Sequence, residues 1–193
     1  MSSDATVRIQ TAGERSVIWA IVLGTLVRRE FHGRLDGAAD IAVSATDLAT
    51  NLDVSVSTSA YVELPASADT KWRGTIPPAA GWRLIEDIPA RALIDAVEAA
   101  GASLTDLEDH ALNAAADSML SQPVLTVDAP GETPIELSLR ILLCLTRMGF
   151  LAGERADPGN VARVAVNGPW VIIATMQGAV YRRTGTIDLL GLS

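Results

Sequence analysis

The sequence is poor in the residues that most often carry chemistry. Its single cysteine, Cys144, permits no internal disulfide and no thiolate metal site, which fits a reducing compartment. It has two histidines and lacks a phosphate-binding loop, a dinucleotide fingerprint, a His-Glu-x-x-His zinc motif and a Gly-x-Ser-x-Gly nucleophile motif. We therefore predict no cofactor and no metal. The sequence favours a noncatalytic protein without excluding an enzyme of unrecognised class.

Positive charge is also scarce. Lys71 is the only lysine, and the 15 basic residues stand against 23 acidic ones, for a formal net charge of -8. Nonspecific binding to nucleic acid rests mainly on neutralising phosphates with Lys and Arg side chains. The composition therefore argues against nucleic acid as a partner.

The sequence has no apolar run long enough to cross a membrane. The longest run, SVIWAIVLGTLV at Ser16–Val27, has 12 residues, whereas a transmembrane helix needs about 20. It also lacks the small-residue cleavage site of a signal peptide. We expect this run to form a helix that is buried on most of its surface, with Thr11 as N-cap and Glu14 three residues later. The expected location is cytoplasmic, with no membrane contact.

What is present is ample apolar material, 49% of 193 residues, which is enough for one large domain or two small ones. The N-terminal part, residues 1–70, is predicted to be a small α+β subdomain. Its expected elements are strands at 5–10 and 38–44, a helix at 44–51 that opens with a capping box, and a strand or hairpin at 53–64, where apolar and polar side chains alternate.

The C-terminal part, residues 89–193, is predicted to be a second α+β domain, in which antiparallel hairpins pack with helices. An Asn167-Gly168 pair between two apolar runs is a strong hairpin signal. The expected elements are helices at 87–101, 103–120 and 138–149, a hairpin at 124–137, and a three-stranded meander at 161–183.

Between the two parts, residues 71–88 hold two of the four tryptophans, Trp72 and Trp82, with Pro77-Pro78 between them. Consecutive prolines favour extended backbone. We predict a linker whose tryptophans pack against the domain at each end, since a large aromatic side chain buries about 150–250 Å². The alternative is that the two tryptophans line a groove for a ligand or peptide.

Two segments, WRGTIPPAAGW at 72–82 and LTRMGFL at 145–151, resemble motifs of an uncharacterised family of two-part actinobacterial proteins. The similarity covers mainly residues 71–183. The resemblance implies a two-part division and a bacterial, cytoplasmic setting. It implies no activity, cofactor or catalytic residue, because none is established for that family.

Two arrangements could carry chemistry, and each has a simpler explanation. Cys144 could act as a nucleophile with His110 as base, yet it lies on the apolar stripe of a predicted helix, where a buried, inert thiol is favoured. Asp106, Asp109 and His110 could hold a metal, yet acidic residues on a helix surface are usually solvated.

Charge is distributed unevenly in the C-terminal part. Residues 84–136 hold eleven acidic residues and one basic residue, whereas residues 137–187 hold six arginines and two acidic residues. The candidate partner-binding residues are Arg140, Arg147, Arg163, Arg182 and Arg183. Alternatively, these arginines pair with acidic residues of the same chain, which contributes at most about 1 kcal/mol per exposed pair.

Three functions stay open. The preferred one is a noncatalytic interaction or regulatory module that binds itself or another protein through the arginine-bearing face. The second is an enzyme of unrecognised class. The third is a nucleic-acid binder resembling a winged helix, with the helix at 138–149 as reader and the hairpin at 170–183 as wing. The sequence does not indicate whether a small-molecule ligand exists.

Overall fold

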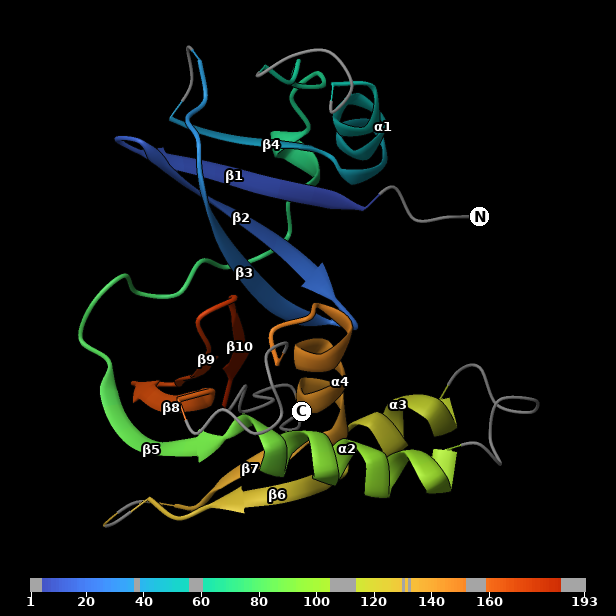
Figure 1. Ribbon diagram of the computed structural model, residues 1–193, viewed down its shortest axis with the longest axis vertical. Coiled ribbons are helices and arrows are strands. Elements are labelled where there is room, and N and C mark those ends of the chain that lie inside the picture. Colours follow the sequence, from blue (N-terminus) through green and yellow to red (C-terminus); the bar gives the residue numbers. More distant parts are fainter. Residues whose placement is uncertain are drawn as a thin grey trace, which may run out of the picture. The chain divides into compact units, whose positions relative to one another are not determined.

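The computed structural model divides the chain into two compact units, Met1–Ile76 and Pro77–Ser193. The boundary between them falls inside the Trp- and Pro-bearing stretch 71–88. Figure 1 shows the course of the chain through both units. The structure describes residues 5–36, 39–55, 61–104, 114–129, 131, 133–151 and 159–184.

The first unit contains an antiparallel sheet with the strand order β4-β1-β2-β3. The strands expected at 5–10 and 38–44 are confirmed as β1 and β4. The elements are β1 (Thr6–Ala12), β2 (Arg15–Val22), β3 (Thr25–His32), β4 (Asp40–Ser44), α1 (Ala45–Ser55) and the short 3-10 helix η1 (Asp69–Lys71).

The prediction of a buried helix over Ser16–Val27 is wrong, because these residues form most of β2, a tight turn and the start of β3. Val22 pairs with Thr25, and the two turn residues, Leu23 and Gly24, have φ of 51° and 74°. Positive φ at both positions gives a turn whose twist matches that of a hairpin. The run is rich in β-branched residues, which pack well on a pleated sheet.

The core of the first unit lies between α1 and one face of the sheet. The buried cluster consists of Val7, Ile9, Val43 and Leu48. The N-cap bond of the predicted capping box is present at the start of α1, since the Ser44 hydroxyl accepts a hydrogen bond from the Asp47 N–H at 3.3 Å.

The strand predicted over 53–64 is not found. Residues 53–55 end α1, residues 61–64 lie outside any helix or strand, and residues 56–60 lie outside the described part of the chain. Val62 and Leu64 nevertheless pack against the core cluster. At 61–64 the alternation thus reflects burial of one side of a segment that is not a strand.

The outer edge of β4 is closed by residues 67–69 of the same chain. The Ala68 N–H donates to the Ala42 carbonyl at 2.7 Å, and the Ala42 N–H donates to the Asp69 carboxylate at 2.6 Å. Hydrogen bonds from the Ser67 hydroxyl and the Ala42 amide lower the pKa of Asp69. A side chain here takes the place that a neighbouring strand would fill.

The second unit also mixes strands and helices, so the α+β class is confirmed. Its main antiparallel sheet has the order β10-β9-β8-β5, and β6 and β7 form a separate hairpin. The elements are β5 (Arg83–Pro89), α2 (Ala90–Leu104), α3 (Ala114–Leu120), β6 (Pro123–Val127), β7 (Ile135–Ser138), α4 (Leu139–Arg147), β8 (Val161–Asn167), β9 (Trp170–Ala174) and β10 (Ala179–Arg183).

The predicted hairpin, the last helix and the meander of this unit are confirmed as β6–β7, α4 and β8–β10. The first helix begins later than expected, because Asp87 belongs to β5 and its side chain binds Arg163 on the neighbouring strand. That helix also continues past Gly101 to Leu104. Of the helix expected at 103–120, residues 105–113 lie outside the described part, and residues 114–120 form α3.

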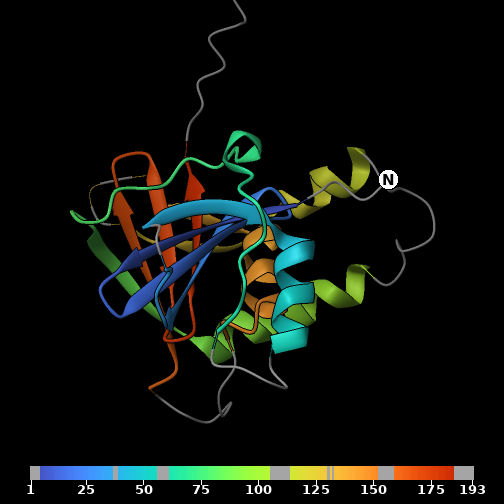
Figure 2. The ribbon, with the colours of Figure 1, turned by 90° about the horizontal axis from the view of Figure 1, so that it is seen from above.

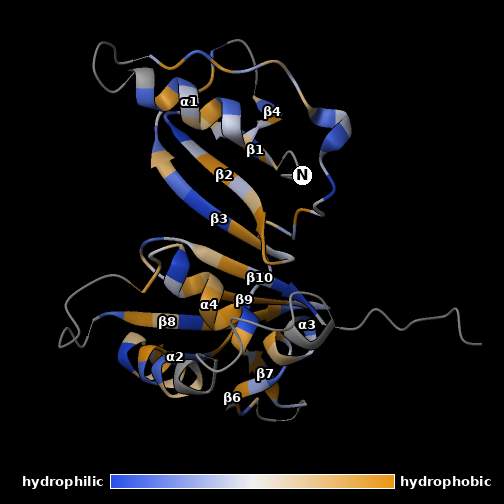
Figure 3. Cartoon of the chain, turned by 90° about the vertical axis from the view of Figure 1, so that its right-hand side faces the viewer, coloured by the Kyte–Doolittle hydropathy of each residue, from blue (hydrophilic) through white to orange (hydrophobic). Residues whose placement is uncertain are grey.

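Helix α4 forms the centre of the core of the second unit. It contacts α2, β7 and β10 (Figure 1, Figure 2) and is largely hydrophobic in Figure 3. Its buried residues are Leu139, Ile141, Leu142, Cys144 and Leu145. Cys144 is fully buried, as the pattern predicted. In the part of the chain that the structure describes, no helix is both long and apolar enough to cross a membrane.

Candidate functional site

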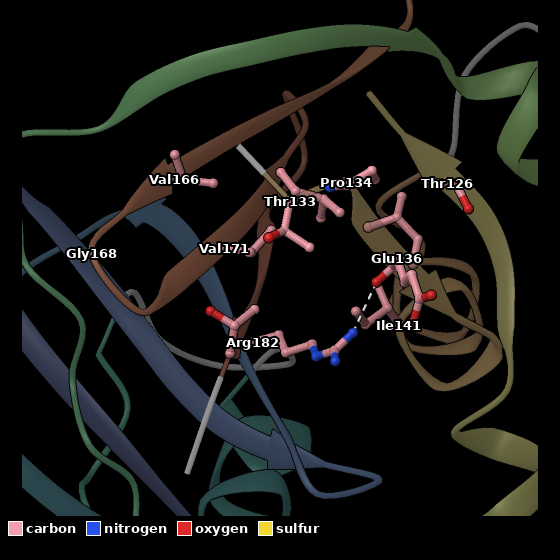
Figure 4. A pocket seen from close by; sticks show the side chains of 12 residues that line it. Thr126, Thr133, Pro134, Glu136, Ile141, Val166, Gly168, Val171 and Arg182 are labelled. Atoms are coloured by element: carbon pink, nitrogen blue, oxygen red, sulfur yellow. Dashed lines mark hydrogen bonds between the residues drawn. The ribbon is translucent and has the colours of Figure 1, made fainter. Parts of the chain in front are cut away.

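A pocket of about 910 Å³ lies in the second unit, where the β6–β7 hairpin, α4 and one end of the meander meet (Figure 4). Its volume is within the range of about 300–1,000 Å³ that is typical of ligand sites. The described residues that line it are Thr126, Thr133, Pro134, Ile135, Glu136, Leu137, Ile141, Val166, Gly168, Val171, Arg182 and Thr184.

One wall comes from the meander. Val166 of β8 pairs with Val171 of β9, which pairs with Arg182 of β10, so the three side chains form one row on the same face of the sheet. Gly168, in the turn that joins β8 to β9, borders this row with a φ of 53°. Asn167 pairs with Trp170, so the two turn residues are Gly168 and Pro169, one position later than the expected Asn167-Gly168 turn, and this turn sets the register of the wall.

The floor is apolar and comes from β7 and α4. Ile135 and Leu137 alternate with Glu136 along β7, so the two apolar side chains share one face and Glu136 takes the other. Ile141 follows one turn into α4 and is 1% exposed. The floor thus gives the pocket an aliphatic base that water scarcely reaches, while Glu136 is exposed.

Arg182 reaches across the pocket to the main chain of β7. Its Nη1 atom donates a hydrogen bond of 2.8 Å to the Glu136 carbonyl oxygen, the dashed line in Figure 4. Glu136 stands opposite Thr126 of β6 in the hairpin. Because Arg182 of β10 reaches the Glu136 carbonyl, this carbonyl points away from β6 and toward the pocket. The edge of β7 that is not paired with β6 therefore presents main-chain groups to the pocket.

The described residues of the pocket offer apolar surface and hydrogen bonds, and none of them forms a recognisable catalytic group. The charged residues among them are Glu136 and Arg182, and the hydroxyls belong to threonines. Among the residues described, no group of three or more His, Cys, Asp and Glu side chains could hold a metal ion. The candidate metal residues Asp106, Asp109 and His110 lie outside the described residues, and so does the candidate base for Cys144.

Three of the five predicted partner-binding arginines, Arg140, Arg163 and Arg182, form hydrogen bonds within the chain. Two of them pair with acidic side chains. Arg140 donates to the Asp117 carboxylate at 2.5 Å, and Arg163 donates to the Asp87 carboxylate at 3.0 and 3.3 Å. The bond from Arg163 lowers the pKa of Asp87. These pairs match the alternative of pairing within one molecule.

The strand register separates the arginines of the meander. Arg182 lies in the row that faces the pocket, whereas Arg163 and Arg183 lie on the opposite face, near opposite ends of the strands. Arg147, in the last turn of α4, is exposed. Within the described part of the chain, Arg182 is thus the one member of the predicted set that lines the pocket, and partner binding by all five arginines stays a prediction.

Sequence reasoning did not find the pocket. Most of its residues are small or aliphatic and carry no motif, and the residues joined by the Arg182–Glu136 bond are 46 positions apart. The available signals were the alternation in β7 and the Asn-Gly turn, which predicted the elements but not their meeting point.

The sequence matches the model of a family described as a domain of unknown function, DUF8185, over residues 77–187. The chain belongs to this family, and the match corresponds to the second unit. No curated protein matches the chain in sequence.

The fold is similar to that of bacterial sliding clamps. Similar structures include the pol III beta protein of Caulobacter crescentus, with a TM-score of 0.60 and 13% identity, over 92% of this chain and 56% of that one. The Helicobacter pylori beta clamp bound to a DNA ligase peptide has a TM-score of 0.54 and 10% identity, over 94% of this chain and 58% of that one. The Pseudomonas aeruginosa clamp with ligand has a TM-score of 0.54 and 12% identity, over 95% of this chain and 57% of that one. This chain therefore spans less than two thirds of each clamp chain.

Proposed function

We propose that this protein is a noncatalytic protein-interaction module, in which the pocket of the second unit receives an extended peptide segment of a partner protein. The observation that carries the proposal is the pocket itself, which combines an aliphatic floor with a main-chain edge of β7. Peptides that add to a strand edge gain main-chain hydrogen bonds, while pockets beside that edge select their side chains.

The fold likeness supports the same class of function. The Helicobacter pylori clamp was solved with a peptide of another protein bound to it. At 10% identity the likeness extends to the fold, so the choice of partner depends on the residues of this pocket. A single buried cysteine fits the reducing cytoplasm as the place where this module acts.

We test the proposal by selecting a random-peptide phage library on the immobilised full chain, and by measuring the recovered peptides by fluorescence anisotropy. Thr133 is exposed at the pocket, so Thr133→Trp should fill the pocket without disturbing the core. We expect this variant to lose about tenfold or more in affinity, equivalent to about 1.4 kcal/mol.

The matched control is Thr46→Trp, which places the same side chain on an exposed position of α1 in the first unit. It should bind the recovered peptides as the wild type does. Equal losses in the two variants, or no enriched peptide at all, would remove the pocket as a peptide site.

Self-association is part of the same proposal. The acidic residues of 84–136 and the arginines of 137–187 are opposite charges on one chain, so two copies can pair complementary surfaces. We expect size-exclusion chromatography with light scattering to show a dimer whose population falls as salt is raised. A monomer at every concentration would exclude self-association and leave the peptide pocket untouched.

A further inference from the structure

Resting on the proposed peptide site, we infer that Arg182 makes the pocket selective for peptides with an acidic side chain. Arg182 holds the edge of β7 closed in the absence of a partner, and its guanidinium binds the peptide carboxylate once a strand has replaced it at that edge. The pocket thus binds peptides through the edge of β7 and selects among them through Arg182.

The main-chain geometry supports the first part of the inference, that Arg182 caps the edge of β7. In an antiparallel pair, the N–H and C=O of one residue point to the same side of the strand. Because the Glu136 carbonyl accepts from Arg182, this pair of groups faces the pocket and is available to an incoming strand. The Arg182 Nη1–H therefore occupies the position that a peptide N–H would take.

The first unit contains a similar arrangement at the edge of another strand. There the Asp69 carboxylate accepts from the Ala42 N–H at 2.6 Å and occupies an edge position of β4. Charged side chains placed at sheet edges are a common means of preventing unwanted strand pairing. At β7 the capping side chain lies in a pocket large enough for a ligand, so there the cap can be exchanged for a peptide.

The hydrogen-bonding capacity of Arg182 supports the second part of the inference, that its guanidinium binds a peptide carboxylate. A guanidinium has five N–H donors in a planar fork that suits a carboxylate. Within the described part of the chain, the Arg182 side chain makes one hydrogen bond, the one to the Glu136 carbonyl. Its remaining donors border an aliphatic floor, where a charge is less screened than in open water.

The Glu136 side chain does not strongly repel a peptide carboxylate bound at Arg182. Glu136 is exposed, and strand alternation places its side chain on the face of β7 opposite Ile135 and Leu137. The peptide carboxylate at Arg182 and the Glu136 carboxylate thus lie on different faces of the edge strand.

The experiment is a double-mutant cycle with the full chain. The two probes are a peptide recovered from the phage library and its counterpart with Asp or Glu replaced by Asn or Gln. The protein variants are Arg182→Gln, which keeps a donor for Glu136 but removes the charge, and Arg183→Gln, a neighbour on the opposite face of the sheet. We expect the wild type and Arg183→Gln to prefer the acidic peptide by about fivefold, and Arg182→Gln to show no preference.

Three outcomes are distinguishable. Acidic residues enriched on the wild type, together with coupling at Arg182, support the inference. Peptides that bind the pocket without acidic preference, or with equal coupling at Arg182 and Arg183, overturn it and leave the peptide function intact. A library that yields no pocket-dependent peptide overturns the proposed function, and the inference falls with it.

Discussion

Replacing Phe150 with alanine is expected to lower the free energy of unfolding of the second unit by about 3 to 5 kcal/mol. Phe150 has 0% exposure and heads the fully buried side chains of the described residues by volume. Its removal leaves a cavity beside α4, because neighbours packed at crystal-like density relax only in part. Chemical denaturation of the variant, followed by circular dichroism, measures the loss.

The sequence supplies a matched control, since it has two phenylalanines. Phe31 lies on β3 and is 40% exposed, so Phe31→Ala should cost about 1 kcal/mol or less. Comparable losses in the two variants would mean that Phe150 does not anchor the core of its unit.

The position of Phe150 explains the motif LTRMGFL. The Phe150 N–H donates to the Leu145 carbonyl at 2.8 Å, and the Gly149 N–H donates to the Thr146 carbonyl at 3.0 Å. With Gly149 at a φ of 67°, these two bonds form a Schellman motif, the helix ending in which the residue after the glycine packs back on the last turns. The motif therefore encodes a helix end and a core contact.

The second unit was largely predictable because its signals are local. The meander follows from the apolar runs on either side of Asn167-Gly168, with the turn at Gly168-Pro169, and α4 follows from apolar residues at helical spacing that end at Gly149. Each signal acts within a few residues, so no distant contact is needed to interpret it.

The first unit was harder because one apolar run suits two structures. Residues 16–27 are apolar nearly throughout, so neither a period of two nor a period of 3.6 stands out, and the helix was predicted from the apolar run and from Thr11 and Glu14 as a helix start. The decisive feature was the turn at Leu23-Gly24. Leucine is rare at positive φ, so Leu23-Gly24 is a weak turn signal at a place where pairing between β2 and β3 determines the structure.

The candidate site was the least predictable part, for a physical reason. Arg182 was singled out by charge, yet its place in the pocket depends on the register of β9 with β10 and on a contact with β7. Arg183 carries the same charge one residue later and lies on the other face. Composition cannot separate two such neighbours, whereas strand alternation does so once the strand is known.

The motif WRGTIPPAAGW also has a structural basis on both sides of the boundary between the units. In the first unit, a Cβ at Gly74 would lie 2.4 Å from the Trp72 ring, so glycine is required beneath that ring. In the second unit, the Trp82 indole donates to the Pro78 carbonyl at 3.0 Å, and Asn167 donates to the Ala80 carbonyl at 2.7 Å. Each tryptophan thus contacts its own unit.

Trp82→Ala is expected to destabilise the second unit by about 2 to 3 kcal/mol, somewhat less than a fully buried tryptophan would cost, because Trp82 is half-buried. The variant loses the indole bond to Pro78 and the edge-on contact with Tyr181, whose ring centroid lies 5.9 Å away. Trp82→Phe keeps an aromatic edge against Tyr181 and should cost about 1 kcal/mol, the value of one hydrogen bond.

Thermal and chemical unfolding of both variants give the comparison. An unchanged melting temperature for Trp82→Ala would contradict the anchoring role and favour the alternative, in which Trp82 serves as an exposed aromatic for a ligand or peptide.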